Sequence, residues 1–199
     1  MSPTTENADF TVGLDDSGVL LYAGGATGLV LLDGTGEQAV FWAGLAEHAE
    51  DQGLSALAFA EPVIDDPAAG AARAARLLRR LGVDRLLIVA AGADTATALH
   101  AAAGGDFAGV ALIDPAIPPD QLEGLLEQAP MPKLVIVTGS NDAQARAIYR
   151  HAVGPTVIRH LTSSSTRRGG EVLAGEPAEL AEEAIFGFAF GLCGDGRPG

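Results

Sequence analysis

The chain has 199 residues, of which 26 are acidic and 12 basic, and a formal net charge of −14 at pH 7. This length suits one domain with a substantial core, and the acidic balance argues against binding to a nucleic-acid backbone. With 48% hydrophobic residues the chain is too apolar for wholesale disorder. No apolar run approaches the ~20 residues of a membrane-spanning helix, so no membrane partner is expected.

From Gly28 onward, apolar segments of strand length alternate with segments of helical period. The pattern predicts strands at 28–33, 54–60, 85–90, 109–114, 133–139 and 156–161. It predicts helices at 38–52, 67–81, 120–128, 142–153 and 177–192, and one that follows the strand at 85–90 and ends at about 103. The first thirty residues are expected to add one or two strands.

Strands buried on both faces and joined by helices predict an α/β fold. We expect a three-layer sandwich in which helices cover both faces of a mostly parallel sheet of about seven or eight strands. Residues 9–193 are expected to form this single domain, without a lid, between disordered ends at 1–8 and 194–199. The helix at 177–192 is apolar nearly all round and is expected to be buried, with its phenylalanines lining a pocket or contacting a second copy.

The residue types that carry much of enzyme chemistry are scarce. Lys133 is the single lysine, which argues against Schiff-base chemistry unless that residue is buried, and Cys193 is the single cysteine. The four histidines have no ligand spacing with one another or with Cys193, so no metal ion is expected. The first ten residues lack the basic region of a secretory signal, and no internal disulfide can form, so a cytoplasmic location is expected.

From about Gly28 to Leu192 the segments resemble those of the α/β-hydrolase family in their order. GLVLLDGTGEQAVFWAGLAEHAEDQG resembles the strand, oxyanion loop and first helix, and LGVDRLLIVAAGADTATALHAAA the strand, nucleophile elbow and helix. PKLVIVTGSNDAQARAIY resembles the strand and turn that deliver the catalytic acid, here Asp142. The resemblance implies the hydrolase fold without a cofactor, and an oxyanion-like loop that contains Gly34, Thr35, Gly92 and Ala93.

The elbow of that family lifts the attacking side chain on a strained turn between small residues. Two registers are open here. In the one that we favour, Gly92 occupies the position of the nucleophile, which therefore has no side chain. In the other, Gly92-Ala93-Asp94-Thr95-Ala96 makes Asp94 the nucleophile of a hydrolase, which requires a strand two residues longer.

The position of the catalytic histidine is also altered. The segment GGEVL aligns so that Arg168 stands where the histidine is expected, and an arginine remains protonated and cannot accept a proton. His160 is expected on the preceding strand and His100 within a helix, so neither completes a triad. The Ser-His-Asp route is therefore not expected.

The loops after Asp33, Gly92, Asp142 and Arg168 are expected to meet at the carboxyl ends of the strands, where open α/β sheets bind ligands. One hypothesis is a noncatalytic protein that binds a small organic molecule or a partner protein. The alternative is a cofactor-independent cyclase, isomerase or lyase that uses Asp33, Asp94 and Asp142 as acids and bases. Each of these aspartates is also a typical helix N-cap, which gives it a purely structural role.

A nucleotide-binding hypothesis remains open for the N-terminal part. Gly34-Thr35-Gly36-Glu37-Gln38-Ala39 fits the Gly-x-Gly-x-x-Ala pattern between strand and helix, and Glu61 closes the next strand. That arrangement binds NAD through its pyrophosphate and ribose. It leaves the later segments of the chain unexplained.

Overall fold

The computed structural model describes residues 19–22, 24–33, 39–59, 66–138, 142–161, 169–174 and 177–192. Within these ranges seven strands form one sheet in the order β1-β3-β2-β4-β5-β6-β7. The strands are β1 (Val19–Tyr22), β2 (Thr27–Leu31), β3 (Ser55–Phe59), β4 (Arg85–Ala91), β5 (Gly109–Ile113), β6 (Lys133–Thr138) and β7 (Thr156–Leu161). Only β1 runs antiparallel to its neighbour, so the prediction of a mostly parallel sheet of this size is confirmed.

The order of the strands creates a switch point between β2 and β4. After β2 the chain adds β3 on one side of it, and then crosses back to add β4 on the other side. Strands β2 and β4 pair in parallel, with Leu31 opposite Val89. Ligands of open α/β sheets bind outside the carboxyl ends of the strands at such a point.

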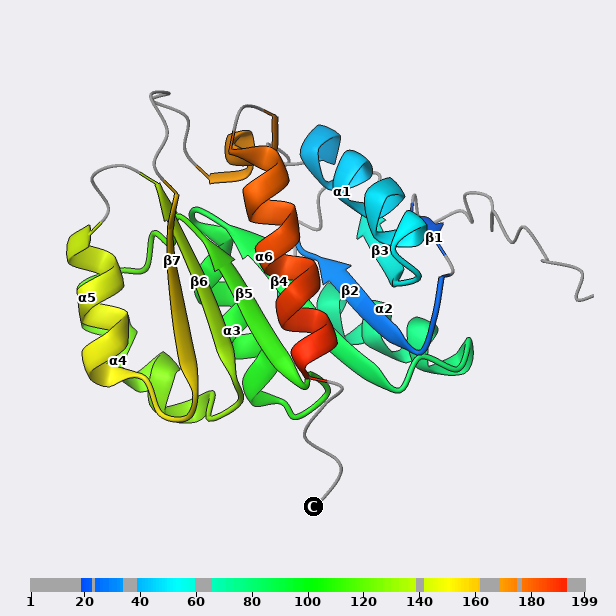
Figure 1. Ribbon diagram of the computed structural model, residues 1–199. Helices are drawn as coiled ribbons and strands as arrows, with labels where there is room; N and C mark the ends of the chain where they lie inside the picture. The colour runs from blue at the N-terminus through cyan, green and yellow to red at the C-terminus, as the bar shows by residue number, and fades with distance from the viewer. Residues whose placement is uncertain are drawn as a thin grey trace, which may run out of the picture.

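Helices cover both faces of the sheet, which gives the predicted three layers (Figure 1). One face is covered by α2 (Pro67–Arg80), α3 (Asp94–Ala103), α4 (Pro119–Gln128) and α5 (Asp142–His151). The other face is covered by α1 (Ala39–Asp51), the short 3-10 helix η1 (Gly169–Ala174) and α6 (Ala178–Gly191). The sheet is thereby the shared wall of two apolar cores.

Strand β4 explains why the apolar runs of this chain become central strands. Its residues from Leu86 to Ala91 are all fully buried. Alternate side chains point to opposite faces of a strand, so Leu86, Ile88 and Ala90 enter one core, and Leu87, Val89 and Ala91 enter the other. Because the side chains on both faces of such a strand enter an apolar core, its sequence is a continuous apolar run.

The ends of α2 are determined by local sequence. Asp66 caps the helix, because its Oδ1 accepts a hydrogen bond from the Ala69 amide at 2.9 Å. Pro67 begins the helix, where a missing amide proton costs nothing, and Gly82 follows its end with a φ of +86°. The four arginines of α2 are exposed, as expected of a solvated face: Arg73, Arg76, Arg79 and Arg80.

Helix α6 packs on the sheet along one side: Ala181, Ile185 and Ala189 are buried, but Leu180 is 52% exposed and Phe190 45% exposed. Its apolar composition exceeds what one sheet face can cover. The 3-10 helix η1 was not predicted at all, because six residues carry too little periodicity.

The predicted disordered ends, 1–8 and 194–199, lie outside the described residues. Within the described ranges, none of the helices combines the length and the apolar character that crossing a bilayer requires.

Candidate functional site

Four adjacent strands, β2, β4, β5 and β6, have their carboxyl ends side by side, next to the switch point of the sheet. Asp33 comes shortly after β2, Gly92 directly after β4, Asp114 directly after β5, and Thr138 closes β6. Backbone hydrogen bonds continue the pairing beyond the strands: the Gly92 amide donates to the Ile113 carbonyl at 2.9 Å, and the Asp114 amide to the Ile136 carbonyl at 2.8 Å. These residues therefore form one continuous edge, which is the candidate site.

The turn between β4 and α3 is tight and contains a glycine with a positive φ. Strand β4 ends at Ala91 and α3 begins at Asp94, and Gly92 between them has a φ of +55°. Its carbonyl accepts hydrogen bonds from Thr95 Oγ1 at 2.7 Å and from the Ala116 amide at 3.0 Å. A Cβ built on Gly92 would meet no described atom within 4 Å. The turn is thus fixed by its neighbours, and a Cβ at Gly92 would contact none of the residues that the structure describes.

The two registers of the elbow differ in how far β4 extends. The alternative required β4 to extend by two residues, whereas the strand ends at Ala91 and Asp94 already belongs to the helix. The expected capping role of Asp94 is wrong, since Ala93 occupies the N-cap and makes no side-chain capping bond. Asp94 lies one position further in, where a carboxylate is favoured by the helix dipole. Its side chain is only 5% exposed.

Asp33 is fully buried beside the same switch point. It follows Leu32, whose amide donates to the Val89 carbonyl at 2.9 Å and whose carbonyl accepts from Trp42 Nε1 at 3.0 Å. Because Trp42 is itself fully buried in α1, this bond attaches the end of β2 to the helix that covers it. Asp33 is therefore held in place from both sides, by β4 and by α1.

Asp114 is a member of this edge that sequence reasoning missed. It is 6% exposed and adopts a φ of +42°, and it accepts hydrogen bonds from the Thr138 amide and from Thr138 Oγ1. Its carboxylate thus joins the ends of β5 and β6. The signal was present: Asp114 follows an apolar run, as Asp33 does, and precedes Pro115.

Other predicted site residues stay predictions. Residues Gly34, Thr35, Gly36, Glu61 and Arg168, and the side chain of Asp142, lie outside what the structure describes, although α5 does begin at Asp142. His100 is exposed on α3, and His160 is exposed on the edge strand β7. Because β5 and β6 separate β7 from β4, the backbone of His160 lies roughly 14 Å or more from that of β4. No group of three or more His, Cys, Asp or Glu residues in the described ranges is arranged to hold a metal ion.

No family model and no curated protein matches the chain. Solved structures do resemble it. One, reported with two metagenome-derived lipolytic enzymes, LipS and LipT, has a TM-score of 0.71 at 15% identity over 88% of this chain and 98% of its own. The dienelactone hydrolase of Anabaena variabilis has a TM-score of 0.65 at 19% identity, over 85% and 90%. Est1E from Butyrivibrio proteoclasticus has a TM-score of 0.69 at 10% identity, over 88% and 93%. At such identities the likeness concerns the fold, and the chain therefore has the α/β-hydrolase fold.

Proposed function

We propose that this protein binds a small, partly apolar organic molecule at the carboxyl ends of its strands and does not hydrolyse it through an elbow nucleophile. The observation that carries the proposal is Gly92, which occupies the turn between β4 and α3 with a φ of +55°. The turn keeps the strained backbone that lifts a nucleophile in this fold, but glycine offers no atom that can attack.

The position of the site favours a ligand. It lies at the switch point of the sheet, where this class of fold binds small molecules. A Cβ added at Gly92 would have no described atom within 4 Å, and buried Asp33 and Asp94 flank the turn. A few polar groups held at fixed positions are typical of small-molecule sites.

The first test is an esterase assay with 4-nitrophenyl acetate. We expect no turnover above background for the wild type, and none for Gly92→Ser, because a serine hydroxyl without a general base is a weak nucleophile. Asp94→Asn is compared with Asp84→Asn, a matched change at an exposed aspartate. Turnover by the wild type that is abolished by Asp94→Asn but not by Asp84→Asn would overturn the proposal in favour of an aspartate nucleophile.

The second test asks whether the tip of the turn faces an accessible binding site. Gly92→Cys is made in a Cys193→Ser background, so that the only thiol is at the tip. We expect this thiol to react with iodoacetamide, and small esters or aromatic acids to slow the reaction. Ala98→Cys, at a fully buried position of α3, is the control and should stay unreactive in the folded protein. An unreactive thiol at position 92 in a folded variant contradicts the proposed site.

A second candidate is a cofactor-independent acid/base enzyme, as a cyclase, isomerase or lyase would be. The observation that favours it is the burial of two carboxylates, Asp33 and Asp94, beside the same turn. General acid–base catalysis needs such groups held next to the substrate. Compounds that protect the thiol at position 92 are incubated with the wild type and followed by NMR. Conversion that is lost in Asp33→Asn or Asp94→Asn, and kept in Asp84→Asn, would establish this candidate in place of the first.

A further inference from the structure

Helix α6 lies between two grooves on the surface of the molecule. The β7/α6 groove has a volume of about 620 Å³ and is lined by Leu134, Val157, Arg159, Leu161, Leu180 and Phe188, among others. The α1/α6 groove has a volume of about 410 Å³ and is lined by Gln52, Glu179, Glu182, Glu183, Phe186 and Phe190, among others. Both grooves contain apolar side chains, but they differ in charge: the β7/α6 groove has Arg159 together with Glu183, whereas the α1/α6 groove has three glutamates, Glu183 among them, and no lysine or arginine in its lining.

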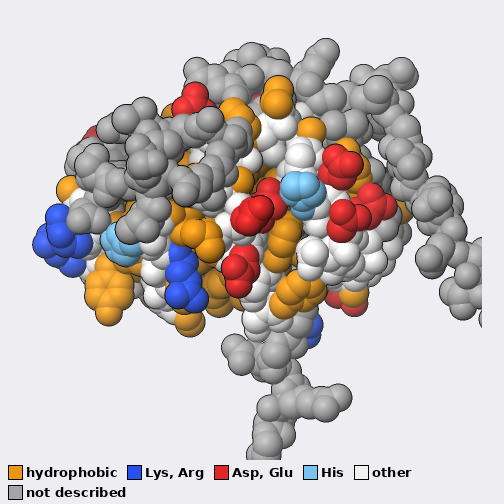
Figure 2. Space-filling model, turned by 45° about the horizontal axis from the view of Figure 1, so that its top comes forward, with side chains coloured by type: hydrophobic (Ala, Val, Ile, Leu, Met, Phe, Trp, Pro, Cys, Tyr) orange, Lys and Arg blue, Asp and Glu red, His pale blue; other side chains and the backbone are white. Residues whose placement is uncertain are grey.

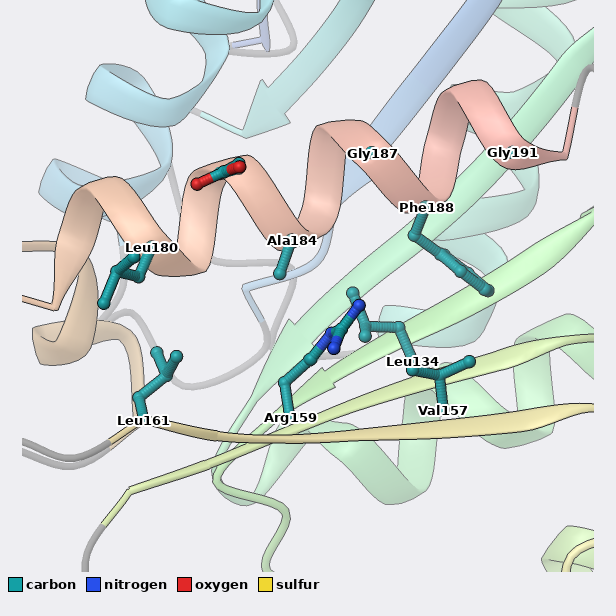
Figure 3. A pocket seen from close by; sticks show the side chains of 10 residues that line it. Leu134, Val157, Arg159, Leu161, Leu180, Ala184, Gly187, Phe188 and Gly191 are labelled. Atoms are coloured by element: carbon teal, nitrogen blue, oxygen red, sulfur yellow. The ribbon is translucent and has the colours of Figure 1, made fainter.

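The β7/α6 groove has the cation of Arg159 in its middle and the carboxylate of Glu183 on its α6 side. Figure 3 shows Leu161 level with Leu180, Arg159 level with Ala184, and Val157 level with Phe188. This register follows from geometry, because two strand residues span about 6.6 Å and four helical residues about 6 Å. At the level of Arg159 the helix presents small residues, Ala184 and then Gly187, so the guanidinium lies over an open apolar floor.

The α1/α6 groove has an acidic rim. Glu179 and Glu183 are exposed on α6, and Glu182 Oε2 lies 2.9 Å from Nδ1 of His48 on α1. Phe190 projects from the same helix near its end and is 45% exposed. In Figure 2 the basic side chains gather on the left, over α5 and β7, and the acidic ones on the right, over α1 and α6, with apolar surface between them.

We propose that this surface, the α6 face, is the interface of a homodimer whose two-fold axis runs parallel to α6. A rotation about such an axis leaves the height of each residue along α6 unchanged and exchanges the two sides of the helix. The β7/α6 groove of each copy therefore meets the α1/α6 groove of the other, and the contact closes on itself. Phe190 of each copy then enters the β7/α6 groove of the other beside Val157, and Arg159 faces the acidic rim.

Charge complementarity selects a second copy as the occupant. A chain of net charge −14 repels its copies overall, so association requires a surface on which both signs are arranged to match. The α6 face has this arrangement. An axis perpendicular to α6 would instead bring Arg159 against its own counterpart, which is unfavourable. Three of the seven exposed large hydrophobic residues in the described ranges also lie on this face: Val157, Leu180 and Phe190.

Sedimentation equilibrium of the full chain over a range of concentrations tests the proposal. The wild type is expected at twice the 20.2 kDa chain mass. Phe190→Asp and Arg159→Glu should each raise the Kd of the dimer by about tenfold or more, because the two-fold symmetry makes each substitution remove the same contact twice. The matched controls are Val40→Asp, at an 82% exposed position of α1 outside both grooves, and Arg73→Glu on α2, which covers the other face of the sheet. Both controls should dimerise as the wild type does.

A charge exchange separates the proposed contact from nonspecific effects. Arg159→Glu combined with Glu179→Arg restores opposite signs across the interface and should recover the dimer, with circular dichroism confirming that every variant is folded. A wild type that is monomeric at all concentrations, or an open-ended series of larger assemblies, overturns the proposal. It is also overturned if the controls weaken the dimer as much as Phe190→Asp does, or if the charge exchange does not recover it.

Discussion

At the scale of the residue, the candidate site depends most on Gly92. Its φ of +55° lies in the left-handed region that residues with a Cβ rarely adopt. No described atom stands within 4 Å of the position of an added Cβ, so the obstacle to a side chain here is backbone conformation and not space. A glycine at this position therefore relieves the strain of the turn.

Gly92→Ala should lower the free energy of unfolding by about 1 kcal/mol, because alanine is strained at this φ. Gly44→Ala is the matched control: it lies within α1, also has open space around an added Cβ, and has no positive φ. There alanine should raise the free energy of unfolding by about 0.5–1 kcal/mol. Urea denaturation of both variants measures the difference. Equal effects at the two positions would contradict the conformational explanation.

Lys133 is the second residue whose chemistry depends on its surroundings. It is fully buried at the start of β6, at the opposite edge of the sheet from Gly92. Its Nζ donates to the carbonyls of Met131 at 2.9 Å and Val153 at 2.7 Å, which ties β6 to the segment before β7. A buried lysine can serve in Schiff-base chemistry, and Lys133 is buried. It lies at the start of β6, however, whereas the candidate site lies at the carboxyl ends of the strands.

Burial lowers the pKa of Lys133 below its ordinary value of 10.5. Between the lowered pKa and 10.5 the unfolded chain binds more protons than the folded one, so stability from this group rises with pH in that window. The free energy of unfolding of the wild type minus that of Lys133→Met should therefore increase as the pH rises from about 8 to about 10. Urea denaturation across this range measures it, and a difference that is constant or falls with pH would refute the prediction.

At the scale of the element, the sequence predicted the strands and helices more completely than the site. Strand β4 was predictable because both of its faces enter a core, and α2 because Asp66 and Gly82 mark its ends locally. The sequence shows Asp114 at the end of an apolar run, but not its role, because that role depends on Thr138, which is 24 residues away in the chain. For α6 the composition indicated more apolar surface than the sheet covers, but periodicity does not say what lies opposite the exposed side, where Phe190 is 45% exposed.

The contact between Asp114 and Thr138 holds the ends of β5 and β6 together, and its removal should be costly. Thr138→Val keeps the shape of the side chain and deletes the hydroxyl that donates to a buried carboxylate. Hydrogen bonds to charged groups contribute about 1.5–3 kcal/mol, so the free energy of unfolding should fall by about that amount. In Thr156→Val the lost bond is exposed and long, at 3.4 Å, and the change should stay within about 0.5 kcal/mol. Similar values for both variants would show that the carboxylate does not need the hydroxyl.

At the scale of the whole molecule, the charge of −14 works against the compact state. Self-repulsion destabilises a folded protein whose net charge is far from zero. The sheet and its two cores must therefore offset this repulsion as well as the entropy of the chain. In a dimer the repulsion grows, and the opposite charges on the flanks of α6 are what would oppose it.

Salt should separate these two effects. From about 0.01 M to about 1 M sodium chloride the Debye length falls from about 30 Å to about 3 Å, so repulsion between surface acids is screened and Tm should rise. The measurement uses Phe190→Asp, the variant expected to be monomeric, because in the dimer screening of Arg159 would act in the opposite direction. Glu127→Gln in that background removes an exposed acid from the last turn of α4, where the helix dipole also disfavours it. This change should raise Tm at low salt, by about 2–4 °C for each kcal/mol regained, and the gain should vanish at high salt. A gain that is the same at both salt concentrations would mean that repulsion does not limit the stability of this fold.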